Sequence, residues 1–352
     1  MRRSLLCWKA GSKAELASMV RAARSGSQPR PSPADGVRLS FAYSGTADLK
    51  AKLERAEAML DSAAGFNDSG GIYYQTLDSL PSIAFLYPGQ GSQTVNMLGG
   101  LRLALPEFED HLLRLDSLYG MVSDESLLAL IYTTPGREAE ERLRDTRNAQ
   151  LALGVIETAL RLSLEALGVR AQFHAGHSYG EFPALCGAGL LDERLLIKLS
   201  LERGTLLAEA GQKAPGGMIA LAGSREAVEA LCDGVGGSLE IVNINSDRQL
   251  VVAGPVEVIA RVEEAAGRKG MPARILNTSC AFHSSLMAPV APQWRQFLKR
   301  TLAKVSPRPT AQVFSNVTAR PYAAAAPDAM ADLLGDQIVK PDRKSTRLNS
   351  SH

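Results

Sequence analysis

A short run of small residues around Ser178 places the strongest constraint on what this chain can fold into. The sequence GHSYG at 176–180 stands between an apolar, strand-like run at 171–175 and a helix-like run at 181–187. Glycines on both sides of a serine relieve the crowding of a sharp strand-to-helix turn and expose the hydroxyl at a helix N-terminus. Backbone N–H groups there can hold a developing oxyanion, which favours a nucleophile. On these five residues alone, an ordinary turn with an exposed serine is the alternative.

The sequence before this turn predicts an α/β fold. The apolar run Ile83–Tyr87 is typical of a buried parallel strand, and it leads directly into the glycine-rich loop PGQGSQ at 88–93. Glycine-rich loops at the ends of central strands are where α/β folds bind ligands. The loop lacks the lysine and the spacing of a phosphate-binding loop, so we reject that function.

Composition and periodicity divide the chain into four parts. Residues 1–80 carry a β-α-β-α-β pattern without clustered catalytic residue types, and we interpret them as a linker subdomain. Residues 81–215 and 282–341 are predicted to form a large, α/β-hydrolase-like subdomain with a parallel sheet. A β-α-β-β-α-β pattern at 216–281 predicts a ferredoxin-like small subdomain inserted into it. Residues 342–352 are polar and aperiodic, so we interpret them as a vector-derived tail and set them aside from the fold.

Charge and hydropathy exclude several classes of function. The 39 Lys and Arg against 37 Asp and Glu give a formal charge of +2, an excess that lies in the final segment, so nothing favours nucleic acid as a partner. No apolar run approaches the ~20 residues that span a bilayer, and the N-terminal apolar run is too short for a signal peptide. The four cysteines (Cys7, Cys186, Cys232 and Cys280) are far apart and form no metal-ligand spacing. We therefore expect a soluble, cytoplasmic protein with reduced cysteines and no metal.

Three features now coincide: the serine turn, the Gly-Gln-Gly loop on an earlier strand, and a histidine directly after the inserted subdomain. Together they resemble the malonyl-CoA:acyl-carrier-protein acyltransferase family, which includes the acyltransferase domains of polyketide and fatty acid synthases. The resemblance covers residues 83–341. It rests on PGQGSQ at 88–93, GHSYGE at 176–181, ERG at 202–204, NINS at 243–246 with VVAGP at 251–255, AFHS at 281–284 and SNVT at 315–318.

The context of the domain also follows from resemblance. Residues 1–80 look like the linker that joins a ketosynthase to its acyltransferase in a type I synthase polypeptide. The residues around Tyr179 are most similar to iterative polyketide synthases of the enediyne and polyunsaturated fatty acid type.

The resemblance implies acyl transfer through a covalent acyl-serine, which splits an exchange between two thiols into two displacements. Ser178 is expected to be the nucleophile and His283 the base that takes its proton. The backbone N–H groups of Gln90 and Tyr179 are expected to form the oxyanion hole. The family needs no acidic third residue: a backbone carbonyl near the SNVT block, which we place at Asn316, is expected to orient the histidine.

Substrate choice is implied by further positions. Arg203 is expected to bind the malonyl carboxylate, because a guanidinium holds a carboxylate by two parallel hydrogen bonds. Phe282 resembles the malonyl-selective version of the family, whose bulky ring leaves little room for a 2-methyl branch. Asn243 and Asn245 match positions that line the thioester entrance, although asparagines that stabilise a turn are the alternative. Tyr179 departs from the smaller aliphatic residue or glutamine that is frequent in the family.

The expected partners are malonyl-CoA, an acyl carrier protein domain and a ketosynthase domain of the same polypeptide. No cofactor is implied, because coenzyme A enters with the substrate and phosphopantetheine belongs to the carrier protein. A thioester hydrolase of the editing type is the main alternative, since water can resolve an acyl-serine; Arg203 argues against it. A catalytically silent docking domain is disfavoured because Ser178, His283 and Arg203 occur together.

Overall fold

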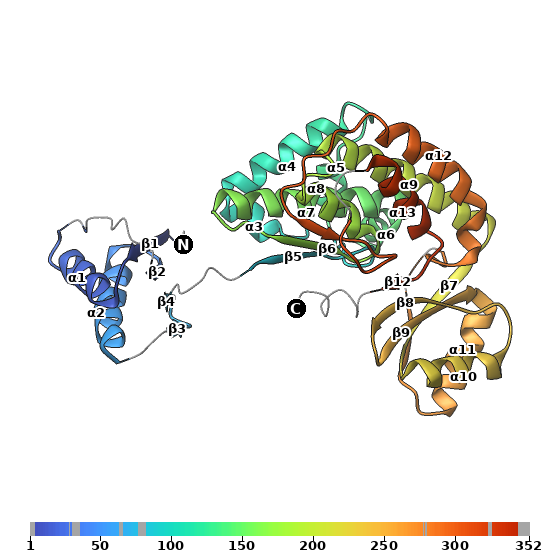
Figure 1. Cartoon of the computed structure of the whole chain (residues 1–352), viewed down its shortest axis with the longest axis horizontal. Coiled ribbons are helices and arrows are strands. Elements are labelled where there is room, and N and C mark those ends of the chain that lie inside the picture. Colours follow the sequence, from blue (N-terminus) through green and yellow to red (C-terminus); the bar gives the residue numbers. More distant parts are fainter. Residues whose placement is uncertain are drawn as a thin grey trace. The chain divides into compact units, whose positions relative to one another are not determined.

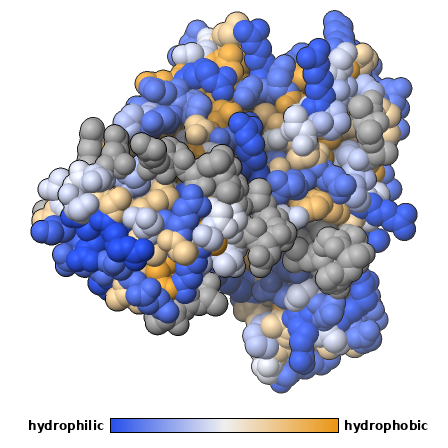
Figure 2. Space-filling model, turned by 60° about the vertical axis from the view of Figure 1, so that its left-hand side comes forward, coloured by the Kyte–Doolittle hydropathy of each residue, from blue (hydrophilic) through white to orange (hydrophobic). Residues whose placement is uncertain are grey.

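The computed structural model describes residues 4–27, 29, 36–62, 66–76, 82–276, 278, 280–322 and 326–343 (Figure 1). Two compact units divide the chain, residues 1–81 and residues 82–352. Within the described ranges no helix is long and apolar enough to cross a membrane. On the face drawn in Figure 2, hydrophilic side chains are spread among scattered apolar ones.

The first unit is an antiparallel sheet with two helices. Its elements are β1 (Ser4–Ala10), α1 (Lys13–Arg24), β2 (Val37–Tyr43), α2 (Thr46–Ser62), β3 (Phe66–Asp68) and β4 (Ile72–Thr76), and the strand order is β1-β2-β4-β3. Alternation along β2 buries Leu39 and Phe41 in a core with Leu16. The pattern at 1–80 predicts only three strands, because β3 is too short to show a period.

The large part of the second unit contains a parallel sheet with strand order β11-β6-β5 and a set of helices. Helix α8 contacts all three strands. Figure 1 shows α7, α8 and α9 stacked on one side of this sheet. The strands are β5 (Ala84–Tyr87), β6 (Phe173–Gly176) and β11 (Gln312–Phe314). The helices are α3 (Gly99–Ala104), α4 (Pro106–Tyr119), α5 (Leu127–Ile131), α6 (Arg137–Arg144), α7 (Thr146–Ala166), α8 (Glu181–Gly187), α9 (Glu193–Lys213), α12 (Ala291–Leu302) and α13 (Pro327–Gln337), with 3₁₀ turns η1 (Ser178–Gly180) and η2 (Ser285–Val290).

The small part of the second unit is a sheet covered by two helices. Its elements are β7 (Gly216–Ala222), α10 (Arg225–Val235), β8 (Glu240–Ser246), β9 (Gln249–Pro255), α11 (Val256–Arg268) and β10 (Ala273–Leu276). The antiparallel order β10-β7-β9-β8 follows from the β-α-β-β-α-β sequence of the ferredoxin-like unit. The predicted α/β class, with a parallel sheet and this inserted subdomain, is confirmed.

The segment that we set aside from the fold contributes to it, which corrects that part of the sequence interpretation. Asp342–Arg343 form β12, which pairs in parallel with β8 at Asn243 and Ile244. The Asp342 side chain is buried and accepts a hydrogen bond from the backbone of Ser178. A two-residue strand in a polar run has no sequence signal of its own. The rest of the segment, 344–352, lies outside the described residues.

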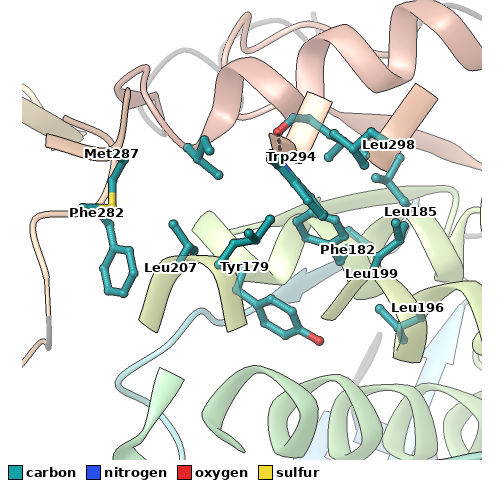
Figure 3. Close-up of a cluster of buried hydrophobic side chains, with 14 of the residues drawn as sticks. Tyr179, Phe182, Leu185, Leu196, Leu199, Leu207, Phe282, Met287, Trp294 and Leu298 are labelled. Atoms are coloured by element: carbon teal, nitrogen blue, oxygen red, sulfur yellow. Dashed lines mark hydrogen bonds between the residues drawn. The ribbon is translucent and has the colours of Figure 1, made fainter. Parts of the chain in front are cut away.

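Aromatic packing behind the serine turn fixes where α7 and α9 lie. Tyr179 is fully buried, and its ring stacks on that of Phe182 with 5.8 Å between the ring centroids. Figure 3 shows both side chains within the buried cluster. The Tyr179 hydroxyl lies 2.7 Å from the Ser200 hydroxyl on α9. On α7, a Cβ placed on Gly154 would lie 2.3 Å from the Tyr179 hydroxyl. The tyrosine therefore requires a glycine on the facing helix.

We expect Gly154→Ala to lower the free energy of unfolding by about 1–3 kcal/mol, because the new methyl group overpacks the site. The cost of overpacking exceeds the ~1 kcal/mol by which alanine stabilises a helix relative to glycine. Adding Tyr179→Phe should restore most of the loss, since the ring carbon Cζ lies 3.4 Å from that methyl position. Urea unfolding of the single and double variants measures this. Gly267→Ala, at a helical glycine with nothing within 4 Å, is the matched control and should not destabilise. Equal midpoints for Gly154→Ala and the double variant would contradict the assigned clash.

Candidate active site

The serine turn has the strained geometry that its glycines predict. Ser178 adopts φ +50°, a left-handed conformation that is uncommon outside glycine. A Cβ on Gly176 would lie 1.9 Å from the carbonyl carbon of Gly180, and one on Gly180 would lie 2.3 Å from the carbonyl oxygen of Tyr87. Only glycine fits at either position. The turn thus holds the hydroxyl at the start of η1 and α8, against the end of β5.

A histidine from a distant segment completes a dyad with this serine. The Ser178 Oγ lies 2.7 Å from Nε2 of His283, which is buried and has φ +62°. The other ring nitrogen, Nδ1, lies 2.6 Å from the backbone carbonyl oxygen of Gln337. The backbone N–H of His283 donates to the carbonyl of Ile338 at 3.1 Å. A carbonyl at Nδ1 requires N–H there, which leaves Nε2 free to accept the serine proton.

The assignment of Asn316 as the residue that orients the histidine is wrong: Gln337 has that role. Asn316 instead donates its side-chain amide to the backbone carbonyl of Ser178 at 3.1 Å, and its own carbonyl accepts from Arg343. The physical reason is that Gln337 ends α13, and the last carbonyls of a helix lack partners within the helix. The SNVT block therefore supports the serine and not the histidine.

Gln337 is also the functional residue that sequence reasoning missed. Its side-chain oxygen accepts from Nη2 of Arg203 at 3.1 Å, and its side-chain nitrogen donates to the carbonyl of Ser178 at 2.9 Å and to the buried carboxylate of Glu181. One residue thus contacts the base, the nucleophile segment and the buried cation. A lone glutamine at the end of an amphipathic helix gives no signal of such a role.

Arg203 on α9 is a buried cation beside the dyad. Its side chain is 2 % exposed, and its guanidinium lies over the Phe182 ring at 5.4 Å from the centroid. The buried Nε has no hydrogen-bond partner among the described residues. Burial lowers the pKa of Arg203 to about 10, so it remains charged at neutral pH. A buried charge with an unused donor is costly unless a ligand completes its bonding.

The dyad opens into a cavity of about 460 Å³ between the large and small parts of the second unit. Every predicted site residue lines it except Tyr179 and Asn316, and the side chain of Tyr179 lies in the core instead. The wall includes Gln90, Gln150, His177, Ser178, Arg203, Met218, Asn243, Asn245, Gln249, Val251, Arg274, Leu276, Thr278, Phe282 and His283.

The small subdomain adds polar side chains to the wall of this cavity. Asn243 is 4 % exposed, and Asn245 donates to Gln249 at 3.4 Å. The side-chain oxygen of Asn245 and the hydroxyl of Thr278 are buried, and neither has a hydrogen-bond partner in the part of the chain that the structure describes. These groups are available to a polar substrate arm.

His177 and Asp342 lie on the other side of the serine. The Nδ1 atom of His177 is 2.6 Å from the Asp342 carboxylate, and the same oxygen accepts from the backbone N–H of Ser178 at 2.9 Å. Nothing in the sequence pattern indicated this contact. No cluster of three or more His, Cys, Asp or Glu that could hold a metal occurs in the described ranges.

The charge state of His283 is set mainly by burial. Desolvation lowers its pKa to about 4, with opposing effects from Asp342 and the Gln337 carbonyl, which raise it, and from Arg203, which lowers it further. The imidazole is therefore neutral at physiological pH and able to accept a proton. The carbonyl end of α13 favours the imidazolium that forms transiently. The arrangement is that of a serine nucleophile with a histidine base and no acidic third member.

Comparison with known proteins places this geometry in a family. Residues 84–338 match the family described as the acyl transferase domain. The chain is 33% identical over 245 residues to the malonyl CoA-acyl carrier protein transacylase of Bacillus subtilis, covering 68% of this chain and 74% of that protein. It is 32% identical over 265 residues to mycoketide-CoA synthase of Mycobacterium tuberculosis, covering 75% of this chain but spanning only 6% of that much longer protein.

Solved structures agree with this family assignment. The acyltransferase domain from the second module of the salinomycin polyketide synthase superimposes with a TM-score of 0.72 at 26% identity, over 89% of this chain and 69% of that one. A malonyl-transacylase in complex with a type II polyketide synthase acyl-carrier protein gives 0.65 at 30% identity, over 75% and 82%. The acyltransferase domain of an iterative polyketide synthase in enediyne biosynthesis gives 0.67 at 26% identity, over 100% and 84%. The chain therefore belongs to the acyl transferase family, and it is an acyl transferase enzyme.

Proposed function

We propose that this acyl transferase moves a malonyl unit from coenzyme A to the phosphopantetheine thiol of an acyl carrier protein, through an acyl-serine at Ser178. The observation that carries the proposal is Arg203: a buried guanidinium with an unused Nε donor in the cavity that contains the Ser178–His283 dyad. A malonyl group differs from an acetyl group by the carboxylate that such a cation binds. The B. subtilis relative is named for this activity.

The first half-reaction follows from the geometry of the dyad. His283 Nε2 takes the proton of Ser178 Oγ while Oγ attacks the thioester carbonyl. The oxyanion would be held by the backbone N–H groups of Gln90 and Tyr179. When the tetrahedral intermediate collapses, the C–S bond breaks, and the departing coenzyme A sulfur takes the proton from His283. The products are malonyl-Ser178 and free coenzyme A.

The second half-reaction is the reverse with another thiol. The carrier protein's phosphopantetheine thiol gives its proton to His283 and attacks the acyl-serine, and the serine regains its proton as the ester bond breaks. The mechanism is ping-pong and moves protons only between the two thiols and the dyad, so we propose that no metal or cofactor takes part. Asn243 and Asn245 lie in the small-subdomain wall, where the pantetheine arm would enter.

Selectivity within malonyl-type substrates would come from Phe282 rather than Tyr179. Phe282 is 8 % exposed and lines the cavity directly before His283, so its ring limits the space for a 2-substituent. The Tyr179 side chain is buried against Phe182 and Ser200 and does not line the cavity. The unusual residue at 179 is thus a feature of the core, and it does not weaken the malonyl proposal.

Hydrolysis is the competing outcome for any acyl-serine. Nothing observed in the site favours it, whereas a substrate carboxylate bound by Arg203 would hold the acyl chain in one position until the carrier thiol arrives.

We further propose that the chain is part of a type I polyketide synthase, with residues 1–80 as the ketosynthase-acyltransferase linker. Support comes from coverage: the matches to the salinomycin and enediyne acyltransferase domains extend over 89% and 100% of the chain, against 75% for the transacylase bound to a separate carrier protein. The enediyne match and the residues around Tyr179 favour the iterative type. Among the described residues the four cysteines form no disulfide, which fits the reducing cytoplasm that we propose for this chain.

Ser178→Ala should abolish malonyl transfer without unfolding the protein, because the hydroxyl is the covalent acceptor. Incubation with malonyl-CoA followed by intact mass spectrometry tests this: wild type should gain one malonyl group and the variant none. Circular dichroism of the variant is the control for folding. A malonyl adduct on Ser178→Ala would place the acceptor elsewhere.

Arg203→Ala should reduce kcat/KM for malonyl-CoA by about 30-fold or more, since it leaves a buried carboxylate unpaired at a cost of about 2–5 kcal/mol. Acetyl-CoA has no such charge and is the internal control, so its rate should stay level or rise. Arg203→Lys should recover only part of the malonyl rate, because a point charge lacks the two-pronged geometry. Equal losses for both thioesters would show that Arg203 is structural.

The pH dependence of acylation should report the buried base. Since the pKa of His283 is lowered from 6.5 to about 4, kcat/KM for acylation should stay flat as pH falls through 6.5 and decline only towards pH 4. The free energy of unfolding should fall as pH is lowered from about 6.5 to about 4, because in this interval the unfolded chain binds a proton that the buried imidazole does not. Stopped-flow acylation with parallel circular dichroism separates the two effects. An acylation midpoint near 6.5 would contradict a desolvated base.

A further inference from the structure

A buried tyrosine and histidine form a polar pair directly behind the dyad, and no step of the mechanism uses them. Tyr87 ends β5 and His174 lies in the middle of β6; their side chains are 6 % and 2 % exposed. The Tyr87 hydroxyl lies 2.9 Å from Nδ1 of His174, and the rings stack at 5.8 Å with an interplanar angle of 22°. The pair therefore joins the two strands that deliver the Gln90 loop and Ser178.

The surrounding chain packs closely on this pair. A Cβ on Gly187 of α8 would lie 2.5 Å from the Tyr87 hydroxyl and 2.7 Å from Nδ1 of His174. Phe85 packs edge-on against the imidazole at 5.8 Å. A side chain at 187 would displace the hydrogen bond, so the glycine is required by the pair.

Both partners of this hydrogen bond are uncharged near neutral pH. Burial raises the pKa of Tyr87, while burial and the charge of Arg161 lower the pKa of His174 to about 4. Near neutral pH the phenol is thus protonated and the imidazole neutral, and in the tautomer with N–H at Nε2 the Tyr87 hydroxyl donates and Nδ1 accepts. Neither side chain lines the cavity that contains the dyad, so the proposed proton transfers do not use the pair.

The backbone of Tyr87 is in direct contact with the serine turn. Its carbonyl accepts the N–H of His177 at 2.8 Å and lies 2.3 Å from where a Cβ of Gly180 would be. Two residues further, a Cβ on Gly89 would lie 2.4 Å from the carbonyl of His177. Segments 87–89 and 177–180 therefore pack backbone against backbone, and a shift of Tyr87 moves the Gln90 loop relative to Ser178.

We propose that Tyr87 and His174 are positioning residues whose hydrogen bond sets the distance between the Gln90 loop and Ser178, and thereby the fit of the oxyanion in acylation. The proposal rests on the proposed function, because it presumes that the Gln90 loop contributes to the oxyanion hole. The pair touches no reacting atom. Its effect should fall on the chemical step and leave ground-state binding of the thioester unchanged.

The test compares Tyr87→Phe, His174→Leu and His174→Asn in single-turnover acylation by malonyl-CoA. Asparagine and leucine have the same shape, but the asparagine oxygen occupies the place of Nδ1 and can accept from Tyr87. We expect Tyr87→Phe and His174→Leu to lower the acylation rate constant at saturating malonyl-CoA by about tenfold each with KM unchanged, the effect of a small displacement of catalytic groups. His174→Asn should recover most of that loss, and the Tyr87→Phe/His174→Leu double variant should be no slower than the slower single variant.

Two controls keep the outcomes distinct. Tyr119→Phe makes the same change at a tyrosine that is equally buried but outside the cavity lining, and it should leave the rate constant unchanged. The labelling rate of Ser178 with a fluorophosphonate reads the serine and oxyanion geometry without malonyl. If wild type is labelled but never malonylated, the proposed function fails, and the labelling rates of the three variants still decide this proposal. The proposal would be overturned if the variants melted at lower temperatures but kept wild-type rates of acylation and labelling. Equal acylation rates for His174→Asn and His174→Leu would also overturn it.

Discussion

The catalytic arrangement depends on the carbonyl end of one helix. The last turn of α13 leaves the carbonyls of Gln337 and Ile338 without partners in the helix, and His283 takes both, one through Nδ1 and one through its backbone N–H. These two bonds hold the histidine in a left-handed conformation that would otherwise be disfavoured. They also fix the tautomer that leaves Nε2 free for Ser178. A neutral carbonyl thus does what an acidic residue does in other serine enzymes, without adding a negative charge beside a site that must bind an anion.

The same helix end connects the dyad to the buried cation. Burying Arg203 without a matching carboxylate is unfavourable, and the chain offsets this only in part, through the Gln337 side chain and the face of Phe182. An enzyme that paired Arg203 fully with its own carboxylate would be more stable and would have no site for a substrate carboxylate. The incomplete bonding of Arg203 is therefore a requirement of binding an anionic acyl group in a desolvated cavity.

Much of this could be predicted from the sequence, and the failures share a cause. Motif blocks located Ser178, His283 and Arg203, since side-chain chemistry at these positions restricts the residue type. The residue that orients the histidine was misplaced at Asn316 because a backbone carbonyl is independent of residue type and leaves no motif. Asp342 was set aside because its polar surroundings hid a buried contact. The inward direction of Tyr179 was missed because the space for it is provided by Gly154, which lies on another helix far away in the sequence.

The two parts of the second unit have different roles: one holds the catalytic residues, and the other forms the facing wall of the cavity. Ser178, Arg203 and the Gln337 carbonyl belong to α8, α9 and α13 or to the turns that start and end them, and a continuous core that includes Phe182, Leu199 and Trp294 packs these helices together. The small subdomain contributes the opposite wall of the cavity through its strands and the segment after β10, with side-chain groups of Asn245 and Thr278 that have no hydrogen-bond partner among the described residues. Because Ser178 and His283 are held mainly by contacts of the helical part, side chains of the small-subdomain wall can change with the thioester while those contacts remain. A substitution in that wall should therefore alter KM for the thioester, whereas one in the helical core should alter the acylation rate constant.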